Sequence, residues 1–149
     1  MINKRFSMLF IFFLFTVVIF GGCGGSADDD VDLIQPGRYN VTYGENLDYP
    51  SWDILYDDSY IRVFSFKRVG NNDYELTLSG LIWWKDSIGN TDYTNLSSNK
   101  YQNLPMTKID DYLYETIPGF TPYVGLIIYD EENIGLITDE FDVDLEYAY

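Results

Sequence analysis

The chain has 149 residues, with nine Lys and Arg against 24 Asp and Glu, no His and one Cys, and a net charge of −15. This inventory excludes a disulfide, a metal site built on His or Cys, a Ser-His-Asp triad and a Cys nucleophile. So acidic a chain also lacks the basic footprint that phosphate binding needs, and we expect no nucleic-acid partner.

An apolar segment occupies residues 6–20, in which only Ser7 and Thr16 are polar. As a helix it would reach about 22 Å, which is short of the roughly 30 Å hydrocarbon core of a bilayer. Lys4 and Arg5 precede it as a positively charged flank. The segment therefore predicts an N-terminal signal-peptide helix, with residues 1–22 removed by cleavage.

The residues after this segment read Phe20-Gly21-Gly22-Cys23. They resemble the lipobox of bacterial lipoproteins, which implies a diacylglyceryl group on the Cys23 thiol and cleavage before it. In Gram-negative lipoproteins that resemble this one, a residue other than Asp after the Cys implies the outer membrane, and Gly24 stands here. Residues 23–32 are small or acidic, and we expect a lipidated, flexible tether.

Cleavage would leave 126 residues, enough for one domain, which we place at residues 33–149. Loss of Lys4 and Arg5 would leave seven basic residues and a net charge of −17. The domain alternates apolar and polar residues between clusters of Gly, Asn, Asp and Pro, which predicts an all-β fold. The strands that we expect, in chain order, are 38–43, 61–68, 74–84, 112–117, 123–129 and 136–145.

The first half of the domain predicts a hairpin, in which the turn residues 69–73 join strands 61–68 and 74–84. The alternation places Ile61 and Val63 on one face, and Phe64 and Phe66 on the other. From Leu81 onward the second strand is apolar on both faces, as in a strand that enters the centre of a sandwich. The stretch 95–102 is polar and unpatterned, and we expect a mobile loop there.

The second half carries a resemblance over residues 104–143. A Met, a short turn and a Tyr-centred strand ending in Ile117-Pro118 precede a hairpin with an acidic turn. This order resembles the second half of bacterial immunoglobulin-like and fibronectin III-like modules, which implies an immunoglobulin-like β-sandwich with a binding role and no catalytic residue. Because alternation does not fix strand order, an up-and-down, lipocalin-like β-barrel is the alternative. In the last strand we expect Phe141, Val143 and Leu145 to point inward.

Carboxylates are plentiful, so an Asp or Glu pair in a hydrolase is one enzymatic alternative. They cluster in expected turns, however, where Asp is favoured for its local hydrogen bonds, and we assign no catalytic residue. Two turns hold oxygen ligands suited to calcium without the spacing of a known calcium loop, and we assign no metal ligand or cofactor. The carboxylate clusters are Asp57-Asp58, Asp110-Asp111, Asp130-Glu131-Glu132 and Asp139-Glu140. Of the two turns considered for calcium, the first holds Asp86, Asn90 and Asp92, and the second holds Asp130, Glu132 and Asn133.

Aromatic side chains are the third candidate feature, and Trp52, Trp83 and Trp84, with Tyr49 and Tyr56, are candidates for stacking on a sugar ring. Adjacent residues of a strand point to opposite faces, so at most one of Trp83 and Trp84 belongs in the core. The other could meet solvent or a ligand, or residues 49–52 could fold over it as a lid.

The sequence thus predicts a lipid-anchored, non-catalytic binding module of the bacterial envelope. The membrane is contacted through the lipid on Cys23, and the further partner is an envelope protein or a glycan. A net charge of −17 disfavours anionic headgroups and phosphate polymers, and favours a basic or neutral partner.

Overall fold

A computed structural model of the chain describes residues 34–149, which form an all-β structure with no α-helix in that range. The all-β prediction is confirmed. The elements are β1 (Tyr39–Asn46), β2 (Asp53–Ile54), β3 (Tyr60–Arg68), β4 (Asp73–Lys85), β5 (Thr91–Asn95), a 3-10 turn η1 (Asn99–Tyr101), β6 (Leu104–Lys108), β7 (Leu113–Thr116), β8 (Val124–Ile128), β9 (Asn133–Thr138) and β10 (Phe141–Tyr147).

Eight of the strands form a hydrogen-bonded ring in the order β1, β3, β4, β6, β7, β8, β9, β10, and β10 pairs with β1 to close it. From β1 to β10, each strand of the ring pairs with the ring strand that follows it in the sequence. Strands β2 and β5 lie outside the ring and pair with the two edges of β4. This order is the meander of an up-and-down barrel, the alternative fold from the sequence. It differs from the Greek-key connections of an immunoglobulin-like sandwich.

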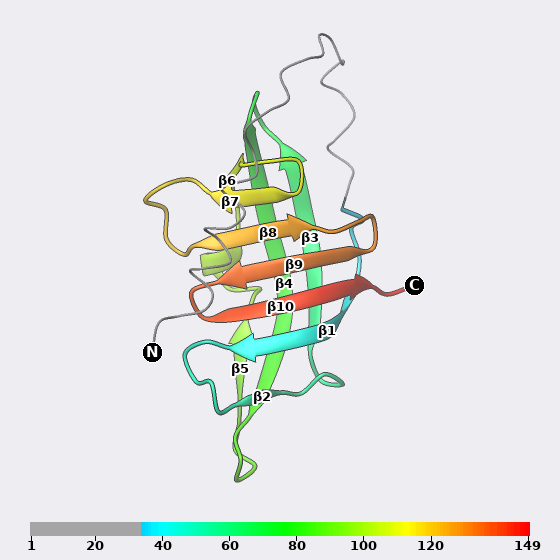
Figure 1. Cartoon of the computed structure of the whole chain (residues 1–149), viewed down its shortest axis with the longest axis vertical. Coiled ribbons are helices and arrows are strands. Elements are labelled where there is room, and N and C mark those ends of the chain that lie inside the picture. The colour runs from blue at the N-terminus through cyan, green and yellow to red at the C-terminus, as the bar shows by residue number, and fades with distance from the viewer. Residues whose placement is uncertain (1–33) are drawn as a thin grey trace, which may run out of the picture.

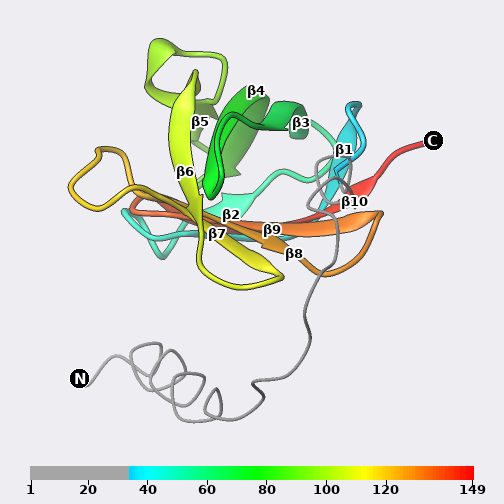
Figure 2. The same ribbon diagram turned by 90° about the horizontal axis from the view of Figure 1, so that it is seen from above.

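The ring is flattened into two packed layers, which confirms the sandwich-like arrangement. Strands β3, β4 and β5 form one layer, and they run across β1, β10, β9, β8 and β7 of the other (Figure 1; Figure 2). Strand β6 joins the layers on one side because it pairs with both β4 and β7. On the other side the only pair between β1 and β3 is Tyr39 with Ile61.

The core lies between the two layers and is filled by inward side chains of every ring strand. Phe141, Val143 and Leu145 are at most 1% exposed, as predicted. The expected strand 136–145 is wrong as a single strand, because Asp139 and Glu140 form the turn between β9 and β10. Thr138 stabilises this turn by accepting the Glu140 and Phe141 N–H groups at its Oγ1.

A β-bulge in β3 changes the face of one predicted residue. The pairing with β4 shifts between Val63 and Ser65, so Phe64 is the extra residue and is 66% exposed. Phe66 was expected on the same face as Phe64, but it packs against the core. A bulge inserts one residue and thereby reverses the alternation beyond it.

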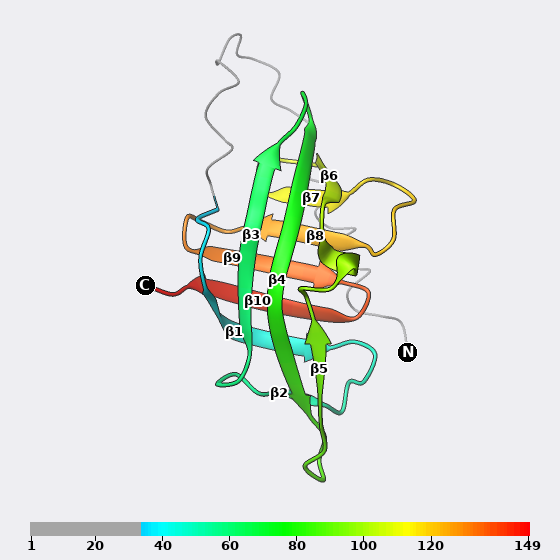
Figure 3. The same cartoon turned by 180° about the vertical axis from the view of Figure 1, so that it is seen from behind.

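The predicted hairpin of β3 and β4 is confirmed. Within β4, Trp84 lies in the core at 2% exposure, while Trp83 faces outward. Gly80 lies midway along β4 at φ +132°. Its N–H donates to Ser97 Oγ at 3.1 Å, and its carbonyl accepts the Leu96 N–H at 2.9 Å. Here β4 passes from pairing with β6 to pairing with β5 (Figure 3).

The loop expected to be mobile at residues 95–102 is tied to the core. Leu96 is fully buried, and Tyr101, at the end of η1, is 1% exposed. Gln102 Nε2 donates to the Leu78 carbonyl at 2.6 Å. This loop fills the gap on the edge of β4 between β5 and β6, a role that its polar sequence did not indicate.

The predicted signal peptide 1–22, the predicted lipid attachment at Cys23 and the predicted tether 23–32 lie outside the described residues. Within residues 34–149, no helix has the length and apolar character needed to cross a bilayer.

Candidate functional site

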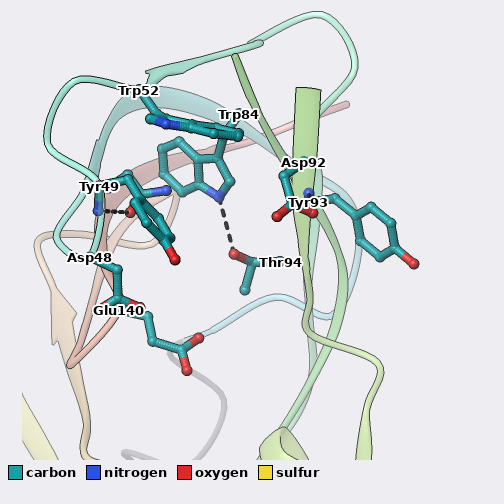
Figure 4. A pocket seen from close by; sticks show the side chains of 9 residues that line it. Asp48, Tyr49, Trp52, Trp84, Asp92, Tyr93, Thr94 and Glu140 are labelled. Atoms are coloured by element: carbon teal, nitrogen blue, oxygen red, sulfur yellow. Dashed lines mark hydrogen bonds between the residues drawn. The ribbon is translucent and has the colours of Figure 1, made fainter. Parts of the chain in front are cut away.

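A small pocket lies at one end of the ring, between the loop after β1, the β9–β10 turn and strand β5 (Figure 4). We call it the rim pocket. It encloses about 70 Å³, room for a few water molecules. The residues that line it are Asn46, Asp48, Tyr49, Trp52, Trp84, Asp92, Tyr93, Thr94 and Glu140.

The loop after β1 is held in place by hydrogen bonds to both layers. Asn46 is 7% exposed, and its Oδ1 accepts the Tyr49 N–H at 2.8 Å. The Leu47 N–H donates to the Glu140 carbonyl at 2.8 Å, which ties the loop to the β9–β10 turn. Strand β2 then pairs with the end of β4, so Trp52 is fixed just before a hydrogen-bonded segment.

Aromatic rings form one side of the rim pocket. Trp52 lies across Trp84 in Figure 4, and the rings of Tyr49 and Trp52 are 5.7 Å apart between centroids at 41°. The Trp84 indole N–H donates to Thr94 Oγ1 at 3.0 Å, which satisfies the one polar group of this buried ring. Trp52 is only partly buried, so part of its ring is open to a ligand.

Carboxylates form the other side. Glu140 makes an ion pair with Lys100, and its Oε2 accepts the Tyr101 hydroxyl at 3.2 Å. Burial, and then the nearby charge of Glu140, raises the pKa of Tyr101 above its ordinary value. Asp92 accepts the Tyr93 N–H at 2.8 Å, while Asp48 is exposed beside Glu140 (Figure 4). The pocket therefore offers hydrogen-bond acceptors and negative charge, and it disfavours anions.

The structure separates the three predicted Trp side chains. Trp52 and Trp84 meet in the rim pocket together with Tyr49, whereas Trp83 points to the outer face of β4. The lid expectation is corrected: residues 49–52 cover the buried Trp84, while Trp83 lies on the opposite face of the strand. Tyr56 is 48% exposed and does not line the pocket.

Sequence reasoning did not bring together the pocket's carboxylates, Asp48, Asp92 and Glu140. Asp92 was considered with one calcium turn and Glu140 with one acidic cluster, and the preference of Asp and Glu for turns explained both. Asp48 was not singled out. In the structure Asp92 lies within β5, while Asp48 and Glu140 lie in the connections after β1 and between β9 and β10.

The acidic turns use their carboxylates for their own geometry. Asp130 accepts the backbone N–H groups of Glu132 and Asn133 at 2.9 and 2.8 Å. These hydrogen bonds, together with one from the side-chain amide of Asn133, lower the pKa of Asp130. Asp86 likewise accepts the Ile88 and Asn90 N–H groups. Among residues 34–149, no group of three or more His, Cys, Asp and Glu is arranged to hold a metal ion.

A second hollow of about 290 Å³ lies on the outer side of β6 and β7. Its lining is mostly apolar, with Ile109, Ile117 and Phe120 between 37% and 48% exposed. Its one carboxylate, Glu115, accepts the Tyr123 hydroxyl at 3.0 Å. The rim pocket is smaller, but it combines aromatic rings with several polar groups, which is the usual composition of a binding site.

Comparisons of the chain with protein-family models, with curated proteins and with solved structures found no match.

Proposed function

We propose that this chain is a lipid-anchored lipoprotein of the bacterial envelope whose β-domain is a non-catalytic binding module. The observation that carries the binding role is the rim pocket, where Trp52 and Tyr49 meet three carboxylates at one end of a ring with a filled core. The anchor rests on the residues Phe20 to Cys23. Gly24 after the Cys favours the outer membrane as the destination.

The rim pocket favours a neutral or basic group. Asp48, Asp92 and Glu140 can accept hydrogen bonds from hydroxyl or ammonium groups, and they repel carboxylates and phosphates. A volume of about 70 Å³ is well below the roughly 300 Å³ of a typical small-molecule site. The pocket thus suits one protruding group of a larger ligand, such as a basic side chain of an envelope protein.

Carbohydrate binding is the second candidate, and the Tyr49–Trp52 pair favours it. A ring that is partly open to solvent offers a flat apolar surface, and the adjacent carboxylates accept hydroxyl protons. The two candidates differ in salt dependence, because contacts between charged groups are screened by salt and stacking is not.

The anchor is tested by replacing Cys23 with Ser. The natural chain should be recovered from the detergent phase of a membrane fraction, with an intact mass that starts at residue 23 and includes acyl groups. The Cys23→Ser chain should lose both the acyl mass and the partitioning, because no thiol remains for the lipid. A natural chain that is soluble and unacylated would end the anchor proposal and leave a freely secreted binder.

The rim pocket is tested by Trp fluorescence titrations of the full chain in detergent, with uncharged monosaccharides and with lysine and arginine amides as probes. Trp52→Ala is expected to weaken binding of the accepted class about tenfold. Asp48→Asn should weaken the amides more than the sugars, because it removes one charge.

Tyr56→Ala is the matched control, since Tyr56 is an exposed aromatic residue just after β2 that does not line the pocket. Binding of amides that falls as salt rises supports a basic partner, and binding of sugars that ignores salt supports a glycan. If neither class shifts the Trp emission, or if Trp52→Ala binds as the natural chain does, the rim pocket is not a binding site.

A further inference from the structure

The outer face of β4 and β5 carries three facing pairs of side chains. Leu81 faces Asn95, Trp83 faces Tyr93, and Lys85 faces Thr91. The layer formed by β3, β4 and β5 is in front in Figure 3. We call these six residues the Trp83 platform.

The central pair of the platform is aromatic and open to solvent. The rings of Trp83 and Tyr93 lie 5.0 Å apart between centroids, with 48° between their planes. Tyr93 is 52% exposed and Trp83 is partly exposed, while the core side of the same strand is filled by Trp84 at 2% exposure. Figure 4 shows the Tyr93 ring pointing away from the rim pocket. The Trp83 ring thus belongs neither to the core nor to the rim pocket, and Tyr93, although it lines that pocket, turns its ring away from it.

Polar groups flank the aromatic pair along both strands. The neighbouring residues on one face of a strand are about 7 Å apart, so Lys85 and Thr91 lie on one side of the rings and Asn95 on the other. Asn95 accepts the Ser97 N–H at its Oδ1, which leaves its NH2 group to donate. The aromatic pair therefore has donors at both ends.

The charge of this layer differs from that of the rest of the domain. Its outer side holds as many cations as anions, and Lys67 pairs with Glu75 at 3.2 Å. With β2 counted at the edge of β4, the charged residues are Arg62, Lys67, Lys85, Asp53, Asp73 and Glu75. The outer side of β1 and β10 holds Glu45, Asp142, Asp144 and Glu146 instead. The platform itself carries only the charge of Lys85, and the outer face around it has no net charge, so in a domain of strongly negative charge this face suits an uncharged ligand.

We infer that the Trp83 platform binds an uncharged polysaccharide chain. Sugar rings stack their C–H faces on Trp83 and Tyr93, and hydroxyls of the adjoining sugars meet Lys85, Thr91 and Asn95. An anionic polymer would gain little here because the cations of the layer are balanced. The platform shares Tyr93 with the lining of the rim pocket but lies on the outer face of the sheet, and it does not depend on the lipid anchor.

The test is co-sedimentation of the full chain, in detergent, with the insoluble uncharged polysaccharides cellulose, chitin and starch. At least one should deplete the chain from solution, and raising NaCl from about 0.05 to about 1 M should change the apparent affinity less than about twofold. Trp83→Ala and Tyr93→Ala should each weaken binding about tenfold or more. Trp83→Phe keeps a ring and should recover part of the affinity.

Phe64→Ala is the matched control, because Phe64 is an exposed ring of the same layer outside the platform. Circular dichroism and thermal unfolding establish that each variant is folded, and Tyr93→Ala removes an exposed side chain in case Trp83→Ala is unstable. The inference is overturned if none of the three polysaccharides sediments the chain, if binding survives both folded alanine variants, or if Phe64→Ala weakens it equally. Loss with Trp52→Ala in place of Trp83→Ala would assign the glycan to the rim pocket, and would also overturn it.

Discussion

Gly80→Ala should lower the free energy of unfolding by about 4 kcal/mol, the combined cost of backbone strain and of overpacking. Gly80 has φ +132°, which an L-residue rarely adopts. A Cβ there would lie 2.9 Å from Ile61 Cα, and closer still to the Tyr60 carbonyl oxygen. Because these neighbours are backbone atoms of β3, the hairpin itself would have to shift. For a domain of this size the melting temperature should fall by roughly 20 °C.

Gly89→Ala is the matched control for this substitution. Gly89 also has a positive φ, +94°, but an added Cβ would meet nothing within 4 Å. It should therefore cost only the backbone strain, about 1 to 2 kcal/mol. Urea unfolding of the two variants, followed by circular dichroism, separates the clash from the strain. Equal midpoints for Gly80→Ala and Gly89→Ala would show that β3 does not crowd Gly80.

Alkaline pH should destabilise the domain by about 2 kcal/mol between pH 10 and pH 11 through two buried tyrosines. Tyr39 and Tyr101 are at most 1% exposed. Burial, then the neighbouring Tyr147, raises the pKa of Tyr39 to about 12. Burial, then Glu140, raises the pKa of Tyr101 as well. The unfolded chain loses these protons near pH 10 while the folded chain keeps them, so stability falls as pH rises from 10 toward the folded pKa values.

Two further tyrosines add to the same trend. Burial and the charge of Asp144 raise the pKa of Tyr129 to about 12, and burial and Glu115 raise that of Tyr123. Tyr129 is 53% exposed, so solvent screens its share, which should be small.

Tyr101→Phe isolates one of the buried groups. It should remove about 1 kcal/mol of the loss of stability between pH 10 and pH 11, because every other titrating group is common to both chains. The measurement is the urea midpoint as a function of pH, with tyrosinate absorbance near 295 nm as the direct readout of ionisation. A natural chain whose midpoint is flat from pH 9 to pH 11 would contradict the raised pKa values.

Much of the fold could be predicted from local patterns. The β3–β4 hairpin followed from its turn residues, and the opposite directions of Trp83 and Trp84 followed from strand geometry. The β-bulge at Phe64 could not be predicted, since nothing in a stretch of alternating residues marks where one extra residue is tolerated. The strand order could not be predicted either, because it depends on pairing between β1 and β10 across about a hundred residues.

The candidate site shows the same division. Trp52 and Tyr49 could be proposed from composition and their position in one loop, but Asp48, Asp92 and Glu140 come from the loop after β1, from β5 and from the β9–β10 turn, which are far apart in the chain. They meet only because ring closure brings the β9–β10 turn beside the loop after β1, where the Leu47 N–H reaches Glu140. Turn chemistry explained each acidic residue separately, so nothing in the sequence linked them.

The meander order has a kinetic consequence. Seven of the eight ladders of the ring join strands that follow one another along the chain, and only the ladder between β1 and β10 joins distant segments. The entropy of loop closure therefore falls mainly on one event, the docking of β10 against β1. A chain that emerges from its N-terminus onward can assemble the hairpins as they appear, yet β1 keeps an open edge until the last strand arrives. Until then the nascent domain presents that edge to chaperones and to other unfinished chains, so its hazard of misassembly is concentrated in the final moments before β10 docks.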